Sequence, residues 1–103
     1  MTTAERLECY RAILEASRES LQVSKETEAN EIAYIQKLKR EIEMIERGEF
    51  GAKPGKRNHI EESLKKWKKL LKATRKTIKW DKEQVAIWEL LVEIEEKKLE
   101  DAK

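Results

Sequence analysis

Lysines and arginines recur every three or four residues between Ser63 and Lys82, a spacing that puts their cationic groups on one side of a helix. Ammonium and guanidinium groups at this density can bind carboxylates or phosphates, through charge and by donating hydrogen bonds. The face they form would be about 26 Å long at the rise of an α-helix. Eight residues make up this surface, which we name the basic band: Lys65, Lys68, Lys69, Lys72, Arg75, Lys76, Lys79 and Lys82.

The net charge of +2 conceals this concentration of basic residues. Residues 1–52 carry 8 basic and 11 acidic side chains, residues 53–82 carry 12 and 3, and residues 83–103 carry 3 and 7. Three interpretations remain open for the basic band. It can be a solvated face partly neutralised by nearby acids, a surface for an acidic protein or the acidic end of another copy, or a surface for a nucleic-acid backbone.

Two tryptophans lie within the same stretch of sequence, but on the other side of its helical wheel. Trp67 and Trp80 fall away from the basic band, where core positions are expected. Bases stack on aromatic rings that are exposed among the charges, so this placement weakens the nucleic-acid interpretation.

No set of residues with the spacing of an enzyme active site is found. Cys9 is the one cysteine and His59 the one histidine, so a disulfide, a cysteine cluster and paired histidine ligands are ruled out within the chain. Phosphate-binding glycine loops, nucleophile-elbow patterns and Glu-x-x-His pairs do not occur. We expect a protein that is not an enzyme and holds no cofactor or metal.

The segment "RGEFGAKPGKRNH", Arg47–His59, contains all three glycines and the one proline. Gly48 is predicted to end a helix in the left-handed conformation, and Pro54-Gly55 to form a turn. Asn58 and Glu61 have the spacing of a capping box, as do Thr2 and Glu5. Phe50 can anchor a partner or fold back onto the helix ends. Four residues of this segment are added to the predicted partner surface: Phe50, Lys53, Lys56 and Arg57.

These signals divide the chain into two long helices around one loop. Helix 1 is predicted over about residues 3–47, the loop over 48–58, and helix 2 over about 59–102, within a single domain of 103 residues. A short loop between long helices favours an antiparallel hairpin. The predicted fold class is therefore all-α, a coiled-coil-like helical hairpin.

The apolar residues follow a seven-residue repeat in both helices, and we label its seam positions a and d. Between Ser24 and Glu31 the seam of helix 1 becomes polar, opposite about Leu71 to Lys82 of helix 2. Glu26, Glu28 and Glu31 are expected near basic residues of the band there. This stretch is either a polar layer that sets the register of the hairpin or a pocket for a small ligand.

A second apolar stripe lies beside the seam, at heptad positions c and g. Packing between the two helices of a hairpin buries only the seam, so we expect another surface to cover the second stripe. We predict a dimer of hairpins that forms a four-helix bundle, with a different protein as the rival occupant, and we expect Cys9 to be buried. The predicted oligomer interface consists of Leu70, Trp80, Ile87, Leu91, Ile13 and Tyr34.

Together these features favour a non-enzymatic interaction protein, such as a small regulator or inhibitor. It would self-associate and occlude or bridge an acidic macromolecular partner through the basic band and loop; the alternative is a nucleic-acid backbone binder without sequence preference. No apolar run has the ~20 residues of a membrane span, and the first residues lack the pattern of a signal peptide, so we expect a cytoplasmic protein.

Overall fold

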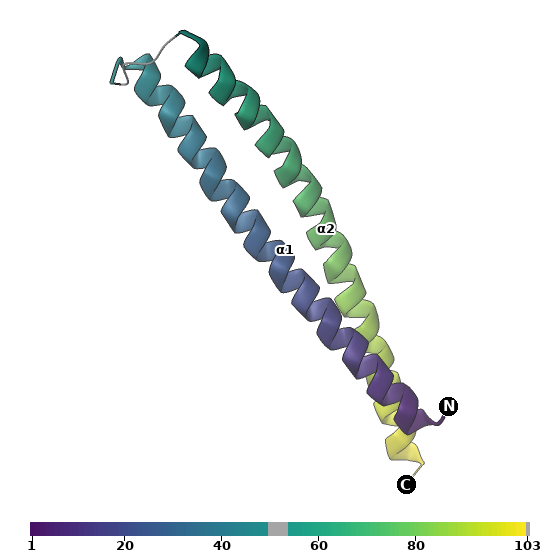
Figure 1. The fold of residues 1–103 in the computed structure, drawn as a ribbon. Coiled ribbons are helices and arrows are strands. Elements are labelled where there is room, and N and C mark those ends of the chain that lie inside the picture. The colour runs from purple at the N-terminus through teal and green to yellow at the C-terminus, as the bar shows by residue number, and fades with distance from the viewer. Residues whose placement is uncertain (50–53, 103) are drawn as a thin grey trace. The chain divides into compact units, whose positions relative to one another are not determined.

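The computed structural model describes residues 1–49 and 54–102, without the side chain of Pro54. Two helices account for most of them: α1, Thr3–Glu46, and α2, Pro54–Asp101 (Figure 1). The helices run antiparallel, and no strand occurs among the described residues. The predicted all-α helical hairpin is confirmed.

Both ends of α1 are capped as the sequence predicts. At the start, the Thr2 hydroxyl accepts a hydrogen bond from the backbone N–H of Glu5 at 3.1 Å, the first half of a capping box. At the end, Gly48 adopts a φ of 73°. The N–H of Gly48 bonds to the Ile45 carbonyl at 3.1 Å, and the N–H of Glu49 bonds to the Met44 carbonyl at 3.0 Å. These two bonds form a Schellman motif.

The start of α2 differs from the prediction. The helix begins at Pro54, so Pro54-Gly55 is the first turn of α2 and not a free turn, and Asn58 lies inside the helix and does not cap it. Proline suits the first helical position because the N–H that it lacks would have no partner there and its φ is already helical. The glycine-rich composition led to the wrong boundary, since proline followed by glycine also favours a turn.

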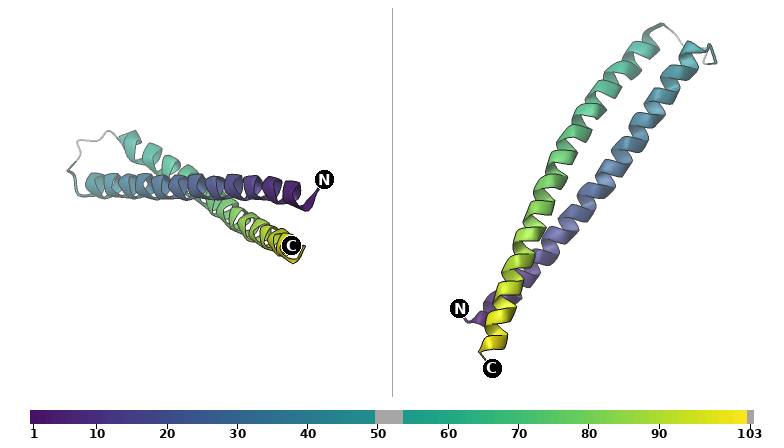
Figure 2. Two further views of the ribbon diagram at one scale, coloured as in Figure 1. Left: turned by 90° about the horizontal axis from the view of Figure 1, so that it is seen from below. Right: turned by 180° about the vertical axis from the view of Figure 1, so that it is seen from behind.

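Contacts divide the chain into two compact units. Unit 1 consists of Met1–Lys25 and Thr77–Lys103, and unit 2 of Glu26–Lys76. In unit 1 the first turns of α1 lie beside the last turns of α2 (Figure 2). Leu7, Leu14 and Val92 are buried there, and Tyr10 meets Trp88 edge to face, with ring centroids 5.4 Å apart.

Unit 2 is built on the same seam. Ile35, Leu38 and Ile60 are buried between the helices. Tyr34 packs on Trp67 with ring centroids 4.5 Å apart. In both units every residue at an a or d position of the described helices is buried or partly buried, from Leu7 to Ile45 and from Ile60 to Leu99. The predicted seam is therefore confirmed along both helices.

The polar part of the seam is occupied by carboxylates that bind hydroxyl groups of the facing helix. In unit 1, Asp81 accepts hydrogen bonds from Ser20 at 3.3 Å and from Ser24 at 2.8 Å. In unit 2, the Thr74 hydroxyl donates to Glu31 at 2.7 Å. These side chains bind one another across the hairpin, which supports the interpretation of the stretch as a polar layer that sets register.

Within residues 1–49 and 54–102, neither α1 nor α2 contains a segment that is both long and apolar enough to span a bilayer.

Candidate partner-binding surface

All eight residues of the basic band are exposed on α2. They occupy heptad positions b, e and f, on the side of α2 that faces away from positions c and g. Six of them belong to unit 2, while Lys79 and Lys82 belong to unit 1. The helical spacing predicted from the sequence thus places the band on one helix, at solvent-accessible positions.

Most of the band has no acidic partner. Arg75 donates to Glu28 at 3.2 Å across the hairpin. None of the seven lysines forms an ion pair with another residue of the described part of the chain, 1–49 and 54–102. Glu28 was predicted near the band and is found there. Neutralisation by the acids of α1 therefore reaches one residue of the band and leaves the lysines to solvent or to a partner.

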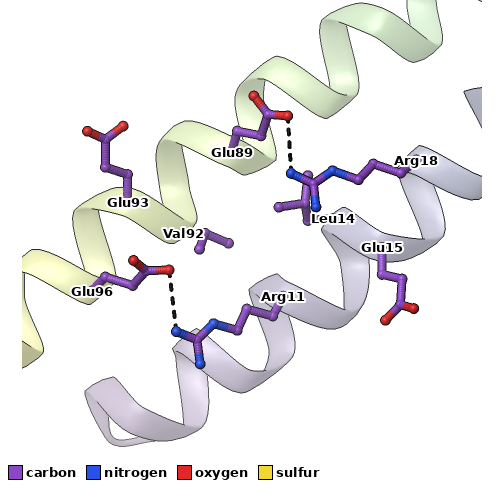
Figure 3. Close-up of a pocket in the computed structure, with 8 residues that line it drawn as sticks. All are labelled: Arg11, Leu14, Glu15, Arg18, Glu89, Val92, Glu93 and Glu96. Carbon is purple, nitrogen blue, oxygen red and sulfur yellow. Dashed lines mark hydrogen bonds and ion pairs between the residues drawn. The ribbon is translucent and has the colours of Figure 1, made fainter.

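Elsewhere on the hairpin the e positions of the two helices form ion pairs. In unit 1, Arg11 pairs with Glu96 and Arg18 with Glu89, each at 3.3 Å. Figure 3 shows the two pairs bridging from α1 to α2 over Leu14 and Val92. The antiparallel register therefore places each e residue of α1 opposite an e residue of α2.

In unit 2 the same register brings Glu46 of α1 and Glu61 of α2 together. Arg57 bonds to both carboxylates, at 2.6 Å to Glu46 and 3.2 Å to Glu61. Arg57 was predicted to contact a partner, but it is engaged within the chain. Its guanidinium has enough donors to hold two carboxylates at once, so it neutralises two like charges that face each other.

A groove in unit 2 gathers three basic side chains around apolar ones. Lys39 of α1 lines it with Lys68 and Arg75 of α2. Ile32, Ile35, Gln36 and Leu71 complete the lining, and the cavity has a volume of about 310 Å³. Lys39 and Lys68 occupy facing e positions, like the ion pairs of unit 1, but both are cationic.

Of the other predicted residues of the loop segment, Lys56 is the one that the structure describes. Lys56 lines a smaller cavity with Glu41, Ile45 and Ile60. The predictions for Phe50 and Lys53 lie outside the described residues. A continuous basic surface from the loop to the helix therefore remains a prediction.

The second apolar stripe is exposed. Trp80 is 57% exposed, Leu70 50% and Ile87 48%, while Leu91 is partly buried. In unit 1 the stripes of both helices meet, because Ile13 and Ala16 of α1 line one cavity with Trp80 and Gln84 of α2. Tyr34 belongs to the stripe in unit 2, at 38% exposure. Cys9 is exposed, and the prediction that it is buried is wrong for the single chain because position c lies beside the seam.

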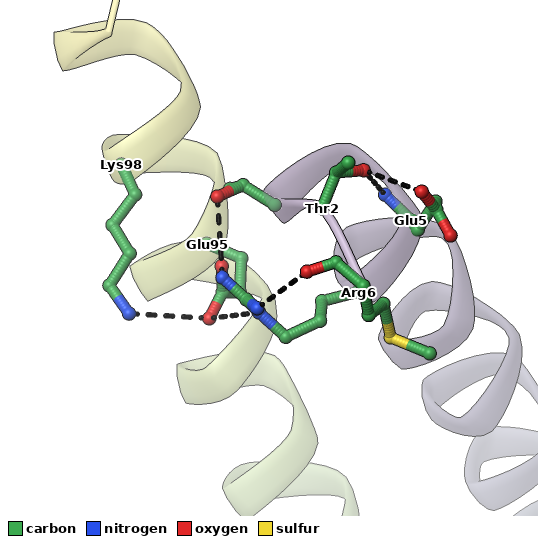
Figure 4. A network of polar contacts seen from close by, with 7 residues as sticks. Thr2, Glu5, Arg6, Glu95 and Lys98 are labelled. Carbon is green, nitrogen blue, oxygen red and sulfur yellow. Dashed lines mark hydrogen bonds and ion pairs between the residues drawn. The ribbon is translucent and has the colours of Figure 1, made fainter.

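A further polar network joins the helices near the chain ends of unit 1. Glu95 is 5% exposed, and its carboxylate lies 3.6 Å from Arg6 and 3.4 Å from Lys98 (Figure 4). The two terminal nitrogens of the Arg6 guanidinium donate hydrogen bonds, Nη1 to the Met1 carbonyl at 3.1 Å and Nη2 to the Thr3 hydroxyl at 3.3 Å. This network anchors the first turn of α1 to α2, and its cations are used within the chain.

Sequence reasoning missed Lys39 and Ile32 as parts of the candidate surface. The signal was present, since both lie at position e of helix 1, the position that faces Lys68 and Arg75 in an antiparallel hairpin. Charge density in the sequence does not reveal this surface, because the basic residues of helix 2 are clustered and those of helix 1 are not. The chain matches no protein-family model, no curated protein and no solved structure.

Proposed function

We propose that this protein is a non-enzymatic interaction protein that binds an acidic macromolecular partner through the basic band and the groove beside it. The observation that carries this proposal is the row of seven band lysines that are exposed and have no acidic partner in the described chain. Ion pairs connect the helices in unit 1 and at Arg57, whereas no lysine of the basic band forms one within residues 1–49 and 54–102. The absence of ion pairs at the lysines of the basic band supports the proposal that this surface binds a partner.

The proposal includes self-association through the second apolar stripe. Trp80, Ile87 and Ile94 are each more than 40% exposed on α2, where a soluble monomer seldom leaves several large apolar side chains together. A second hairpin would cover them with its own stripe and complete a four-helix bundle. Because positions c and g lie away from the basic band, a dimer of this kind leaves the band accessible.

The test measures binding to three labelled probes by fluorescence anisotropy. The probes are a short helical peptide of glutamate, leucine and alanine, a single-stranded DNA, and a double-stranded RNA, each at low and at physiological salt. We expect the acidic peptide to bind and binding to survive the higher salt. Changing Lys65, Lys69 and Lys72 to glutamate should weaken binding about tenfold or more.

A control variant with the same change of charge carries Lys37, Lys66 and Lys97 changed to glutamate, all outside the band. It should bind the peptide like the wild type, and circular dichroism should show both variants to be as helical as the wild type. Absence of peptide binding, or equal loss in both variants, would contradict the proposal. Binding to the nucleic acids alone, with a steep fall in affinity as salt rises, would favour the phosphate-backbone alternative.

A further inference from the structure

The geometry points to the groove of Lys39, Lys68 and Arg75 as a binding site for an acidic segment of a partner protein, one in which carboxylate side chains flank an apolar side chain. This inference rests on the proposed function and assigns it a place in unit 2. It adds residues of α1 that do not belong to the basic band, and it defines the chemistry of the segment that binds.

The first step is that the e positions of the two helices face each other in this hairpin. In unit 1, Lys25 and Lys82 face each other and are both cationic, but the pairs Arg11–Glu96 and Arg18–Glu89 carry opposite charges and form ion pairs. Such flanking pairs are the usual way in which a coiled coil secures its partner helix and its orientation.

The second step is the behaviour of like charges at these positions. Glu46 and Glu61 face each other in unit 2, and Arg57 binds both. The repulsion between two facing carboxylates is thus relieved by a cation from the chain itself. By the same argument, an anion beside a site with two facing cations would relieve their repulsion.

Lys39 and Lys68 are such a site, and the described chain supplies no anion to it. Their residue numbers add up to the same total as those of Arg11–Glu96, Arg18–Glu89 and Glu46–Glu61, so they have the same register, and both line the groove. Neither forms an ion pair with an acid among residues 1–49 and 54–102. Arg75 adds a third cation, shared with Glu28. Facing like charges destabilise helix pairs, so the hairpin itself does not explain this arrangement.

The lining of the groove defines the kind of anion. Ile35 is 5% exposed, and with Ile32 and Leu71 it gives the groove an apolar floor between the cationic groups. A simple inorganic anion gains nothing from this floor, whereas a leucine between two glutamates would bury its side chain there and place carboxylates beside Lys39 and Lys68. The comparable groove of unit 1 is lined by Glu15, Glu93 and the two Arg–Glu ion pairs, so its four acids outnumber its two arginines and it would repel such a segment.

The test is Lys39→Glu, with two readouts on the full chain. The change creates an opposite-charge pair with Lys68, so we expect the melting temperature to rise by about 2 to 4 °C. The same change should weaken binding of the labelled glutamate-leucine-alanine peptide about tenfold. Unchanged peptide affinity, or a lower melting temperature in a chain that remains helical, would overturn the inference.

A second variant tests the apolar floor. Ile32→Ala should weaken binding of the peptide about threefold, and should have no effect on a probe in which alanine replaces the leucines. Equal effects on both probes would mean that the floor does not receive an apolar side chain, and would contradict that part of the inference.

The control is Lys66→Glu, an identical change of charge on an exposed residue of the same unit, at position c and outside the groove. It should leave peptide affinity and melting temperature close to wild type. If the variant with Lys65, Lys69 and Lys72 changed loses the peptide while Lys39→Glu retains it, the proposed function stands and the groove is excluded. If Lys39→Glu loses the DNA probe but not the peptide, the groove binds phosphate and the inference is wrong.

Discussion

At the scale of single residues, the buried carboxylates of the seam are expected to lower the stability of the hairpin. Glu31 and Glu95 are 6% and 5% exposed, and each has one carboxylate oxygen, Oε2, without a hydrogen-bond partner among the described residues. Removing a charged group from water costs several kcal/mol unless its partners replace the lost hydration. One hydroxyl at Glu31 replaces only part of it.

We predict that Glu31→Leu raises the free energy of unfolding by about 1 kcal/mol, because leucine restores the apolar seam and removes the unsatisfied oxygen. Urea denaturation followed by circular dichroism measures this change. Glu43→Leu, at an exposed position of the same helix, is the control and should leave stability nearly unchanged. A destabilised Glu31→Leu would show that the bond to Thr74 outweighs the cost of burial.

The ion pairs of Arg57 give a second prediction at this scale. Arg57→Gln keeps most of the side-chain length but removes the charge, so Glu46 and Glu61 would face each other without a cation. We expect a loss of about 0.5 to 1 kcal/mol in the free energy of unfolding, because both pairs are about half exposed and screened by water. The loss should shrink as salt is added, since ions screen the repulsion as well. A loss that is independent of salt would contradict the electrostatic explanation.

At the scale of the helices, the two described glycines occupy opposite kinds of position. Gly48 ends α1 with a positive φ, whereas Gly55 lies in the first turn of α2 without one. A Cβ added at either position would meet no atom within 4 Å apart from the neighbouring residues and the backbone of its own helix. Any difference between their substitutions therefore comes from the backbone and not from crowding.

We predict that Gly48→Ala lowers the free energy of unfolding by about 1 kcal/mol, because alanine disfavours the left-handed conformation of the Schellman motif. Gly55→Ala should raise it by about 0.5 kcal/mol, since alanine favours the helix and restricts the unfolded chain. Thermal melting of both variants checks the pair. If both substitutions changed the free energy of unfolding in the same direction, the left-handed backbone conformation at Gly48 would not be what makes glycine favourable there.

At the scale of the whole molecule, charge and apolar surface are distributed unequally between the two units. Unit 1 has 9 basic and 12 acidic residues, a net charge of −3, and unit 2 has 14 and 9, a net charge of +5. The larger share of the exposed apolar stripe, including Trp80, Ile87 and Ile94, belongs to unit 1. We therefore expect self-association to use unit 1 and an acidic partner to bind unit 2.

We predict that the protein is a dimer at micromolar concentration, and that Ile87→Glu makes it a monomer by placing a charge within the stripe. Light scattering with size-exclusion chromatography measures the mass. Ala86→Glu adds the same side chain at the neighbouring exposed position b, outside the stripe, and should remain a dimer. A monomeric wild type would contradict self-association and leave the stripe to a different protein.

The single thiol provides an independent check without substitution. Cys9 is exposed on the stripe of α1 in unit 1, so a second copy packed there should slow its reaction with a thiol reagent. We expect the rate to fall as the protein concentration rises through the range of dimer formation. A rate that is independent of concentration would place the interface away from Cys9.

The amino-acid sequence by itself determined the two helices, the seam between them, the cap at Thr2 and the left-handed end at Gly48. These features depend on residues a few positions apart, whose spacing and backbone preferences act locally. It also determined that the basic band lies on one side of α2, because helical periodicity alone decides which residues of a helix share a face.

Tertiary structure decided which residues of the two helices face each other. The register of the hairpin places Lys39 opposite Lys68, and it brings Arg57, a predicted partner residue, to Glu46. These outcomes depend on packing along both helices and on where α2 begins, and the proline-glycine sequence is compatible with both a turn and a first helical turn. Local patterns predict which residues share a face of a helix, whereas only the packed hairpin decides which charges form ion pairs within the chain and which do not.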